Sequence, residues 1–157
     1  MPKKKVMFIS STGGHLEELL KLKPLFEKYD YSLVTEKTKS NLNLKEKYQN
    51  VSFLVYGTKD HLLSYVFKFT FNCFKSIGLY FKYRPKYVVT TGTHTAVPMC
   101  YIAKLFRSKI IFIETFANRD TKTLAGKLVY PIADKFIVQW EGMLKLYPKA
   151  ECWGWIF

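Results

Sequence analysis

The residues best suited to chemistry form a short turn between an apolar run and an amphipathic pattern near the start of the chain. The turn holds Ser11, Thr12, Gly13, Gly14 and His15. A strand–turn–helix of this kind aims backbone N–H groups and the positive helix end at the turn, where phosphate is the usual occupant. The same dipole disfavours an imidazolium at His15, so the ring is suited to accept a proton. The turn is a candidate anion site beside a candidate general base.

A second loop repeats this chemistry further along the chain. Residues 90–98 are again rich in Gly, Thr and His, and the candidate ligand-binding residues there are Thr91, Gly92, Thr93 and His94. Small residues also make tight strand-to-helix turns, so either loop alone is weak evidence for a ligand. Two such loops opening onto one crevice would favour a ligand site, which requires that the strands before them be neighbours.

The pattern along the chain alternates strand and helix. Apolar, β-branched runs predict strands at 5–10, 31–36, 51–56, 86–91, 109–114 and 135–139. Helical spacing fills most of the gaps, at 14–28, 40–48, 62–83, 95–106, 122–132 and 141–147. Pro24 falls inside the first of these helices and should kink or shorten it.

Six strands separated by helices predict an α/β fold with a Rossmann-like parallel sheet and helices on both faces. In the common strand order 3-2-1-4-5-6, the first and fourth strands are neighbours where the winding reverses. Ligands bind at that switch point, outside the carboxyl ends of the strands. The two loops would then meet there.

Standard nucleotide and metal motifs are missing. The turn at 11–15 is not G-x-G-x-x-G, and no G-x-x-x-x-G-K-[ST] occurs. Glu36 ends the second strand where a NAD site places its ribose-binding acid, but without the glycines it is a decoy. Cys73, Cys100 and Cys152 are too widely spaced for a metal knuckle and read as reduced thiols. We expect neither a cofactor nor a bound metal.

Composition favours one basic globular domain. The 157 residues suffice for a substantial core, and 48% are apolar. The formal net charge of +13 points to anionic partners: nucleotide phosphates, a lipid phosphate, a phospholipid surface or nucleic acid. The N-terminal apolar run is too short for a signal-peptide core.

Residues 62–83 combine aromatic and basic side chains. Eight of these 22 residues are Phe or Tyr, and a lysine recurs every seven. On a helix the lysines share one face, so the segment can lie in a bilayer interface beside anionic headgroups. The lysines disfavour a transmembrane span. A helix buried against the sheet and a strand are the alternatives. The residues expected at the membrane are Phe67, Lys68, Phe71, Phe74, Lys75, Phe81 and Lys82.

Several motifs carry a resemblance to one group of enzymes. Thr12-Gly13-Gly14-His15 resembles the Gly-Gly-His loop of GT-B glycosyltransferases that act on polyprenyl-phosphate-linked sugars, such as the peptidoglycan N-acetylglucosaminyltransferase. Residues 113–118, 124–128 and 132–135 are similar to the same group. A narrower resemblance is to accessory subunits of two-chain transferases, and it is carried by residues 128–134, 136–141, 147–150 and 153–157. These subunits are the bacterial capsular and exopolysaccharide β-1,4-galactosyltransferase enhancers, and the eukaryotic membrane-anchoring subunit of the N-acetylglucosaminyldiphosphodolichol N-acetylglucosaminyltransferase.

The resemblance implies the N-terminal, acceptor-side half of a GT-B enzyme. A separate catalytic chain would hold the UDP-sugar, expected to be UDP-galactose. This chain would recruit it to an anionic membrane, as a peripheral protein on the cytoplasmic face of the cell membrane. The acceptor would be a polyprenyl-diphosphate-linked sugar in capsular or exopolysaccharide synthesis. The chain alone would show little activity.

The resemblance also suggests residue roles in an inverting transfer. His15 is the candidate base, or else a phosphate ligand, and Glu114 would bind a sugar hydroxyl or support His15. His94, Asn118 and Arg119 are candidate contacts of the acceptor phosphates.

The chain is expected to form one domain over residues 1–150 with an aromatic tail at 151–157. Aromatic anchors near a terminus suit a partner groove, although the tail could instead fold back onto its own sheet. The expected partner-interface residues are Gln139, Trp140, Trp153, Trp155 and Phe157.

Two other functions compete with this interpretation. A self-sufficient transferase could complete its donor site by homodimerisation. A nucleic-acid-binding domain would suit the charge and the aromatic content, but no RNP-like sequence is present. We therefore expect no nucleic-acid partner.

Overall fold

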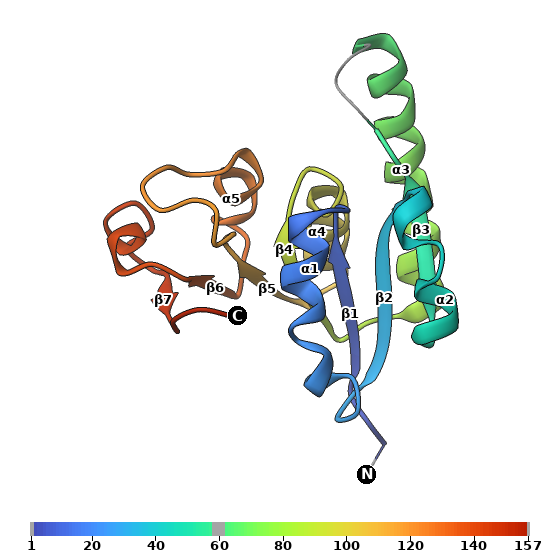
Figure 1. The fold of residues 1–157 in the computed structure, drawn as a ribbon, viewed down its shortest axis with the longest axis horizontal. Coiled ribbons are helices and arrows are strands. Elements are labelled where there is room, and N and C mark those ends of the chain that lie inside the picture. The colour runs from blue at the N-terminus through green and yellow to red at the C-terminus, as the bar shows by residue number, and fades with distance from the viewer. Residues whose placement is uncertain (1, 58–61, 157) are drawn as a thin grey trace.

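A computed structural model describes residues 2–57 and 62–156, and within them the chain forms one parallel sheet flanked by helices (Figure 1). The strand order is β3-β2-β1-β4-β5-β6-β7. The strands are β1 (Lys5–Ser10), β2 (Asp30–Lys37), β3 (Val51–Val55), β4 (Tyr87–Gly92), β5 (Lys109–Ile113), β6 (Lys135–Val138) and β7 (Glu151–Cys152). The α-helices are α1 (Gly14–Leu20), α2 (Leu44–Lys47), α3 (Leu62–Tyr83), α4 (Val97–Leu105) and α5 (Leu124–Val129).

The strands are buried on both faces, because helices cover each side of the sheet. Along β1, Met7 and Ile9 belong to the core under α3, α4 and α5, whereas Phe8 belongs to the core under α1. This alternation follows from the period of two along a strand. The predicted Rossmann-like sheet with helices on both faces is therefore confirmed.

The six predicted strands all form, with ends within one residue of those expected. The helix predicted at 62–83 is α3 itself. The pattern at 14–28 stops at Leu20 and resumes as a 3-10 turn at Lys23–Leu25, because Pro24 lacks the N–H that a continuing helix needs. The pattern at 40–48 becomes a 3-10 turn (Lys39–Asn41) and α2, and 141–147 is the 3-10 helix Glu141–Lys145. The helices predicted at 95–106 and 122–132 shorten to α4 and α5.

The sheet also contains β7, which the sequence analysis missed. Glu151 and Cys152 pair with Ile137 and Val138 of β6, so the sheet continues past residue 150. A two-residue strand is too short to show any periodicity.

The first and fourth strands are neighbours, as predicted. Ile9 pairs with Thr90, and the register then shifts so that Ser10 pairs with Gly92. The turn after β1 and the loop after β4 therefore leave the sheet side by side at the switch point.

Helix α3 has one face on the protein and one exposed face. Its inward face includes Asn72, Ser76 and Leu79, and the Asn72 amide pairs with both the N–H and the C=O of Val55 at 2.8 Å. Figure 1 shows the start of α3 rising beyond the carboxyl ends of the strands. None of the helices in the described part of the chain is long and apolar enough to span a bilayer.

Candidate functional site

The two loops at the switch point are bonded to each other. The Ser11 N–H donates to the Gly92 carbonyl at 3.0 Å, and the Thr93 hydroxyl donates to the Ser11 hydroxyl at 3.2 Å. The Thr91 hydroxyl donates to the carbonyl of His15 at 2.6 Å. The predicted loop residues are thus brought together. We call the following residues the switch-point site: Ser11, Thr12, His15, Glu36, Thr93 and His94.

The His15 ring has a defined hydrogen-bond orientation. Its Nδ1 lies 2.7 Å from the Thr91 carbonyl oxygen, which can only accept, so Nδ1 carries the proton. In the neutral ring Nε2 is then the acceptor, and it has no hydrogen-bond partner within the described residues. The ring is half-buried. This is the arrangement that a general base requires.

The two loops contain three glycines, Gly13, Gly14 and Gly92. Gly92 has φ of +96°, and a Cβ there would lie 3.5 Å from His15 Nδ1. Gly13 has φ of +75°, and a Cβ on Gly13 or Gly14 would meet nothing within 4 Å. The positive φ values explain glycine at positions 13 and 92. The backbone at Gly13 and Gly14 is therefore open to a ligand.

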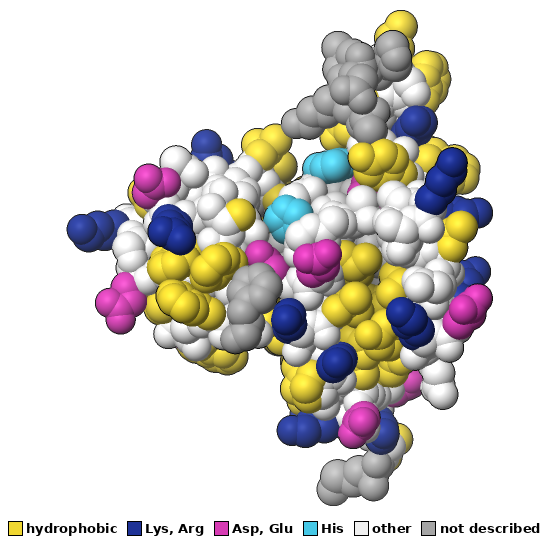
Figure 2. Space-filling view, viewed as in Figure 1, with side chains coloured by type: hydrophobic (Ala, Val, Ile, Leu, Met, Phe, Trp, Pro, Cys, Tyr) yellow, Lys and Arg dark blue, Asp and Glu magenta, His cyan; other side chains and the backbone are white. Residues whose placement is uncertain are grey.

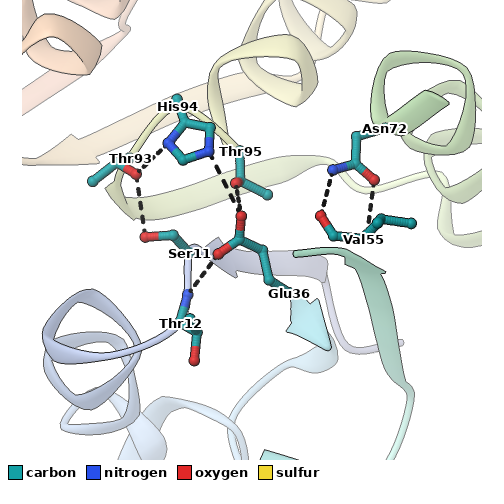
Figure 3. A network of polar contacts seen from close by, with 8 residues as sticks. All are labelled: Ser11, Thr12, Glu36, Val55, Asn72, Thr93, His94 and Thr95. Atoms are coloured by element: carbon teal, nitrogen blue, oxygen red, sulfur yellow. Dashed lines mark hydrogen bonds and ion pairs between the residues drawn. The ribbon is translucent and has the colours of Figure 1, made fainter. Parts of the chain in front are cut away.

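Glu36 is the centre of the polar network in Figure 3. Its carboxylate accepts from the Thr95 hydroxyl at 2.6 Å and from the Thr12 N–H at 3.2 Å, and its side chain is buried. It therefore joins the carboxyl end of β2 to the loops after β1 and β4. From the sequence Glu36 was interpreted as a decoy that mimics the acid of a NAD site, and its part in this network was not predicted. The overlooked signal was an acid ending a strand beside the switch point.

His94 lies over this carboxylate. Its Nδ1 is 3.1 Å from the Thr93 hydroxyl, and its Nε2 is 3.7 Å from Glu36 Oε1, an ion pair only when the ring is protonated. The ring also lies 5.6 Å from that of Tyr65 on α3. His94 therefore connects the switch-point site to the start of α3.

A second carboxylate, Glu18, was not predicted. It is one helical turn after His15 and 4% exposed. Its Oε1 accepts from the Thr115 hydroxyl at 2.8 Å and the Phe116 N–H at 3.1 Å, whereas Oε2 has no hydrogen-bond partner among the described residues. Burial raises the pKa of Glu18, and these two bonds and the nearby His15 ring oppose that rise only in part.

Glu114, the candidate for binding a sugar hydroxyl or supporting His15, contacts residues around α5. Its buried carboxylate accepts from the hydroxyls of Thr123 at 2.9 Å and Tyr147 at 2.7 Å, and its described hydrogen bonds do not include His15. Burial and Glu114 raise the pKa of the Tyr147 hydroxyl well above its ordinary value. A Cβ on Gly126 would collide with both side chains. Glu114 therefore fixes the start of α5.

Asn118 and Arg119, predicted to contact phosphate, have other partners. The Asn118 amide donates to the Thr121 carbonyl at 3.1 Å, and the Arg119 guanidinium lies 4.4 Å from the Trp140 ring centre. Arg119, Trp140 and Trp155 line a hollow of about 590 Å³ beside β6 and β7. Both residues therefore make their contacts away from the His15 loop.

The predicted partner-interface residues have different exposures. Gln139 is 2% exposed, donates to the Glu114 carbonyl and accepts from the Ile156 N–H, so it is a structural residue. Trp153 and Trp155 are 62% and 60% exposed, although Trp155 also packs on Trp140. Phe157 lies outside the described residues. The tail thus folds back and still exposes two aromatic rings.

One face of the molecule is both apolar and basic. Helices α3, α4 and α5 contain five lysines and no acidic residue. Phe67 and Phe74 are 75% and 70% exposed, and apolar and basic side chains lie together around α3 (Figure 2). We call the following exposed side chains the apolar face: Leu63, Val66, Phe67, Phe71, Phe74, Ile77, Phe81, Tyr101, Leu105, Leu124 and Leu128. Lys68 and Lys75 lie half-buried beside this face, and Lys82 is exposed. The contributions of α4 and α5 were not predicted.

A larger hollow lies elsewhere. A depression of about 1030 Å³ lies at the amino ends of the strands, lined by Phe26, Tyr29, Tyr48 and neighbouring lysines. Ligands of open parallel sheets bind at the carboxyl ends, so the polar network at the switch point is the better candidate. Within the described residues, no three His, Cys, Asp or Glu side chains are placed to hold a metal ion.

Comparison with known proteins gives a family. Residues 6–156 match the family described as "Oligosaccharide biosynthesis protein Alg14 like". A relative from Candida albicans, named UDP-N-acetylglucosamine transferase subunit ALG14, is 39% identical over 79 residues, which cover 46% of this chain and 36% of the relative. The mouse protein of the same name is 27% identical over 178 residues, covering 96% of this chain and 82% of the relative. In several other curated relatives, as in the Candida albicans protein, the matched segment spans less than half of the relative's length.

Solved structures show the same fold. MurG of Acinetobacter baumannii superposes with a TM-score of 0.72 at 18% identity, covering 88% of this chain and 42% of MurG. The UDP-N-acetylglucosamine 2-epimerase of Rickettsia bellii gives 0.75 at 16% identity, covering 98% of this chain and 45% of the enzyme. This Rossmann-like domain thus corresponds to one part of larger GT-B-like chains.

Proposed function

The chain belongs to the Alg14 family, and from this premise we propose that it is the acceptor-side subunit of a two-chain, membrane-associated UDP-sugar glycosyltransferase. A separate catalytic chain holds the UDP-sugar. The observation that carries the proposal is His15 at the switch point, with Nδ1 donating to Thr91 and Nε2 left as the acceptor. The names of the relatives, each a transferase subunit, support the division into two chains.

In the proposed reaction the Nε2 of His15 accepts the proton of an acceptor hydroxyl. The hydroxyl oxygen forms a bond to the anomeric carbon while the bond from that carbon to the UDP oxygen breaks. UDP leaves with the bonding pair, and the anomeric configuration inverts. Thr93, His94 and the open backbone at Gly13 and Gly14 are the candidate contacts for the acceptor phosphates. Asn118 and Arg119 are less well placed for this role, since they contact Thr121 and Trp140.

The apolar face supports peripheral attachment to an anionic membrane. Phe67, Phe71, Phe74 and Phe81 point outward on α3, and the absence of acidic residues on α3, α4 and α5 suits anionic headgroups. Attachment there would hold the switch-point site near a lipid-linked acceptor. The cytoplasmic face of the cell membrane is our proposed location.

The transferred sugar depends on the partner chain. The names of the relatives favour UDP-N-acetylglucosamine as the donor. The acceptor linked to a polyprenyl diphosphate is what the sequence resemblance implies. Galactose and a capsular or exopolysaccharide product are the alternatives implied by the sequence resemblance. The exposed Trp153 and Trp155, together with Trp140, on which Trp155 packs, are the proposed contacts of the catalytic chain.

Reconstitution tests the proposal. The chain is co-purified with its donor-binding partner, placed on vesicles and assayed with UDP-N-acetylglucosamine and UDP-galactose on polyprenyl-diphosphate-linked sugars. We expect transfer from one donor by the complex and little transfer by either chain alone. Full activity of this chain alone, with a homodimeric mass, would instead establish a self-sufficient transferase. Preference for RNA over anionic vesicles would point to nucleic-acid binding.

A further inference from the structure

A groove connects the switch-point site to the apolar face. It encloses about 360 Å³, near the lower end of the range for ligand pockets. Tyr65 and Phe69 form one wall from α3, and Leu124 and Leu128 form another from α5. Val97 at the start of α4 also lines the groove.

One end of this groove is polar. Thr93 and His94 line it there, and both belong to the hydrogen-bond network that includes Ser11 and Glu36. The Tyr65 hydroxyl is close enough to this network that burial and the Glu36 charge both raise its pKa. The groove therefore begins at the polar atoms of the switch-point site.

The other end of the groove opens among exposed apolar side chains. Leu124 and Leu128, which line the groove, are themselves 63% and 42% exposed, so they also belong to the apolar face. The Tyr101 hydroxyl donates to the Leu128 carbonyl at 2.9 Å and ties α4 to α5. The apolar part of the lining therefore continues through Leu124 and Leu128 onto the surface.

The charges around the groove select one class of ligand. None of the described residues that line the groove is acidic, and α3, α4 and α5 carry five lysines and no carboxylate. The buried Glu36 carboxylate at the polar end already accepts from the Thr95 hydroxyl and the Thr12 N–H. An apolar channel with a histidine and hydroxyls at one end, formed by helices that carry only basic charges, complements an amphiphile with an anionic head.

We propose that this groove binds the first part of the hydrocarbon chain of a phosphorylated lipid, with the phosphate at Thr93 and His94. The volume suits a short segment of the chain, and the remainder would continue over the apolar face into the bilayer. The inference deepens the proposed function, on which it rests for the identity of the lipid as the acceptor. By holding the hydrocarbon chain, the groove would position the phosphate of the lipid at the switch-point site.

Binding of farnesyl diphosphate, a short and soluble phosphorylated lipid, tests the groove by calorimetric titration of the full chain. Leu128→Trp and Leu124→Trp fill the groove from exposed positions, and Leu105→Trp makes the same change on α4 at a position 76% exposed and outside the groove. Inorganic diphosphate and farnesol report on the head and the chain separately. Circular dichroism confirms the fold, and either groove variant suffices if the other does not fold.

We expect the wild type to bind farnesyl diphosphate more tightly than inorganic diphosphate. Leu128→Trp and Leu124→Trp should weaken farnesyl diphosphate binding about tenfold or more, equivalent to about 1.4 kcal/mol, and Leu105→Trp should not. The proposal that the groove binds the lipid would be overturned if the wild type and the three variants bound farnesyl diphosphate equally. It would also be overturned if the wild type bound inorganic and farnesyl diphosphate with equal affinity.

The transfer assay separates this inference from the proposed function. If complexes containing the groove variants keep the wild-type KM for a lipid-linked acceptor, the groove does not bind the acceptor lipid, and the transferase proposal stands. If the wild-type complex transfers no sugar, the transferase proposal fails. Farnesyl diphosphate binding then still decides whether the groove holds a phosphorylated lipid.

Discussion

His15 Nδ1 lies 2.7 Å from the carbonyl oxygen of Thr91, which joins the turn after β1 to the end of β4. The bond fixes the neutral ring as the tautomer with a free acceptor at Nε2. It exists only because β1 and β4 are adjacent in the sheet. Strand order therefore determines both the position and the proton-accepting atom of the candidate base.

Glu36→Gln should loosen the switch-point site. The carboxylate accepts one hydrogen bond from Thr12 and one from Thr95, each at a different oxygen. The amide has a single oxygen, so it can accept only one of them, and its NH₂ group then faces the other donor. We expect a loss of about 1–3 kcal/mol in the free energy of unfolding, measured by urea denaturation. Glu46→Gln, at an exposed position on α2, is the matched control. Equal stability of both variants and the wild type would contradict a joining role for Glu36.

Glu18 predicts a pH-dependent difference in stability. Burial raises its pKa, so the folded chain holds the Glu18 proton more tightly than the unfolded chain does. The ionised carboxylate therefore costs stability above the folded pKa, and this cost disappears as pH falls toward the unfolded value of about 4.3. Glu18→Gln cannot ionise, so its stability relative to the wild type should rise as pH increases from about 4 to about 7.5.

Urea denaturation at several pH values measures this difference. Glu17→Gln, an exposed change on the same helix, should show no comparable trend. A Glu18→Gln difference that is flat with pH would show that the buried carboxylate carries no such cost. A rise in stability together with slower transfer by the complex would indicate that the orphaned oxygen is kept for function.

Gly126→Ala should be strongly destabilising, because a Cβ there would collide with the side chains of Glu114 and Tyr147. We expect a loss of about 1–3 kcal/mol from this overpacking, read from thermal unfolding. Gly78→Ala is the control, since a Cβ on this α3 glycine meets nothing within 4 Å, and helix propensity makes it neutral or stabilising. Similar melting temperatures for the two variants would contradict the tight packing of Glu114 against α5.

The double substitution Phe67→Ser and Phe74→Ser should weaken membrane binding without unfolding the chain, because both rings are mostly exposed. Each Phe contributes roughly 1–2 kcal/mol on entering the interface, so vesicle affinity should fall about tenfold or more. Flotation with vesicles containing anionic lipid measures the effect, and Leu42→Ser, 48% exposed outside α3, α4 and α5, is the control. Unchanged flotation of the double variant would show that the apolar face does not attach the chain to the membrane.

Apolar, β-branched runs made six of the described strands predictable, and helical spacing made α3 predictable, whereas β7 is too short to show either pattern. The meeting of the two loops was predictable because the sheet has the common order, with the first and fourth strands adjacent. The partners of single carboxylates were not predictable. Glu36, Glu18 and Glu114 have their roles from residues distant in sequence, such as Thr95 for Glu36 and Tyr147 for Glu114.

Helix boundaries and the apolar face show the same limit. Pro24 was a readable stop, whereas the stop that Pro131 provides after the C-cap Tyr130 of α5 was overlooked. The exposed leucines of α4 and α5 look like core residues in sequence. They become part of a surface only when the helices pack beside α3.

The most direct test of the account is the transfer rate of complexes that carry His15→Asn or His15→Gln. Asparagine can keep a donor near the position of Nδ1, toward the Thr91 carbonyl, but it offers no acceptor in place of Nε2. We predict a normally folded complex with acceptor KM little changed and kcat lower by about 10²–10⁴ for His15→Asn. A kcat within about twofold of the wild type for both variants, with both chains present and folded, would contradict His15 as the base.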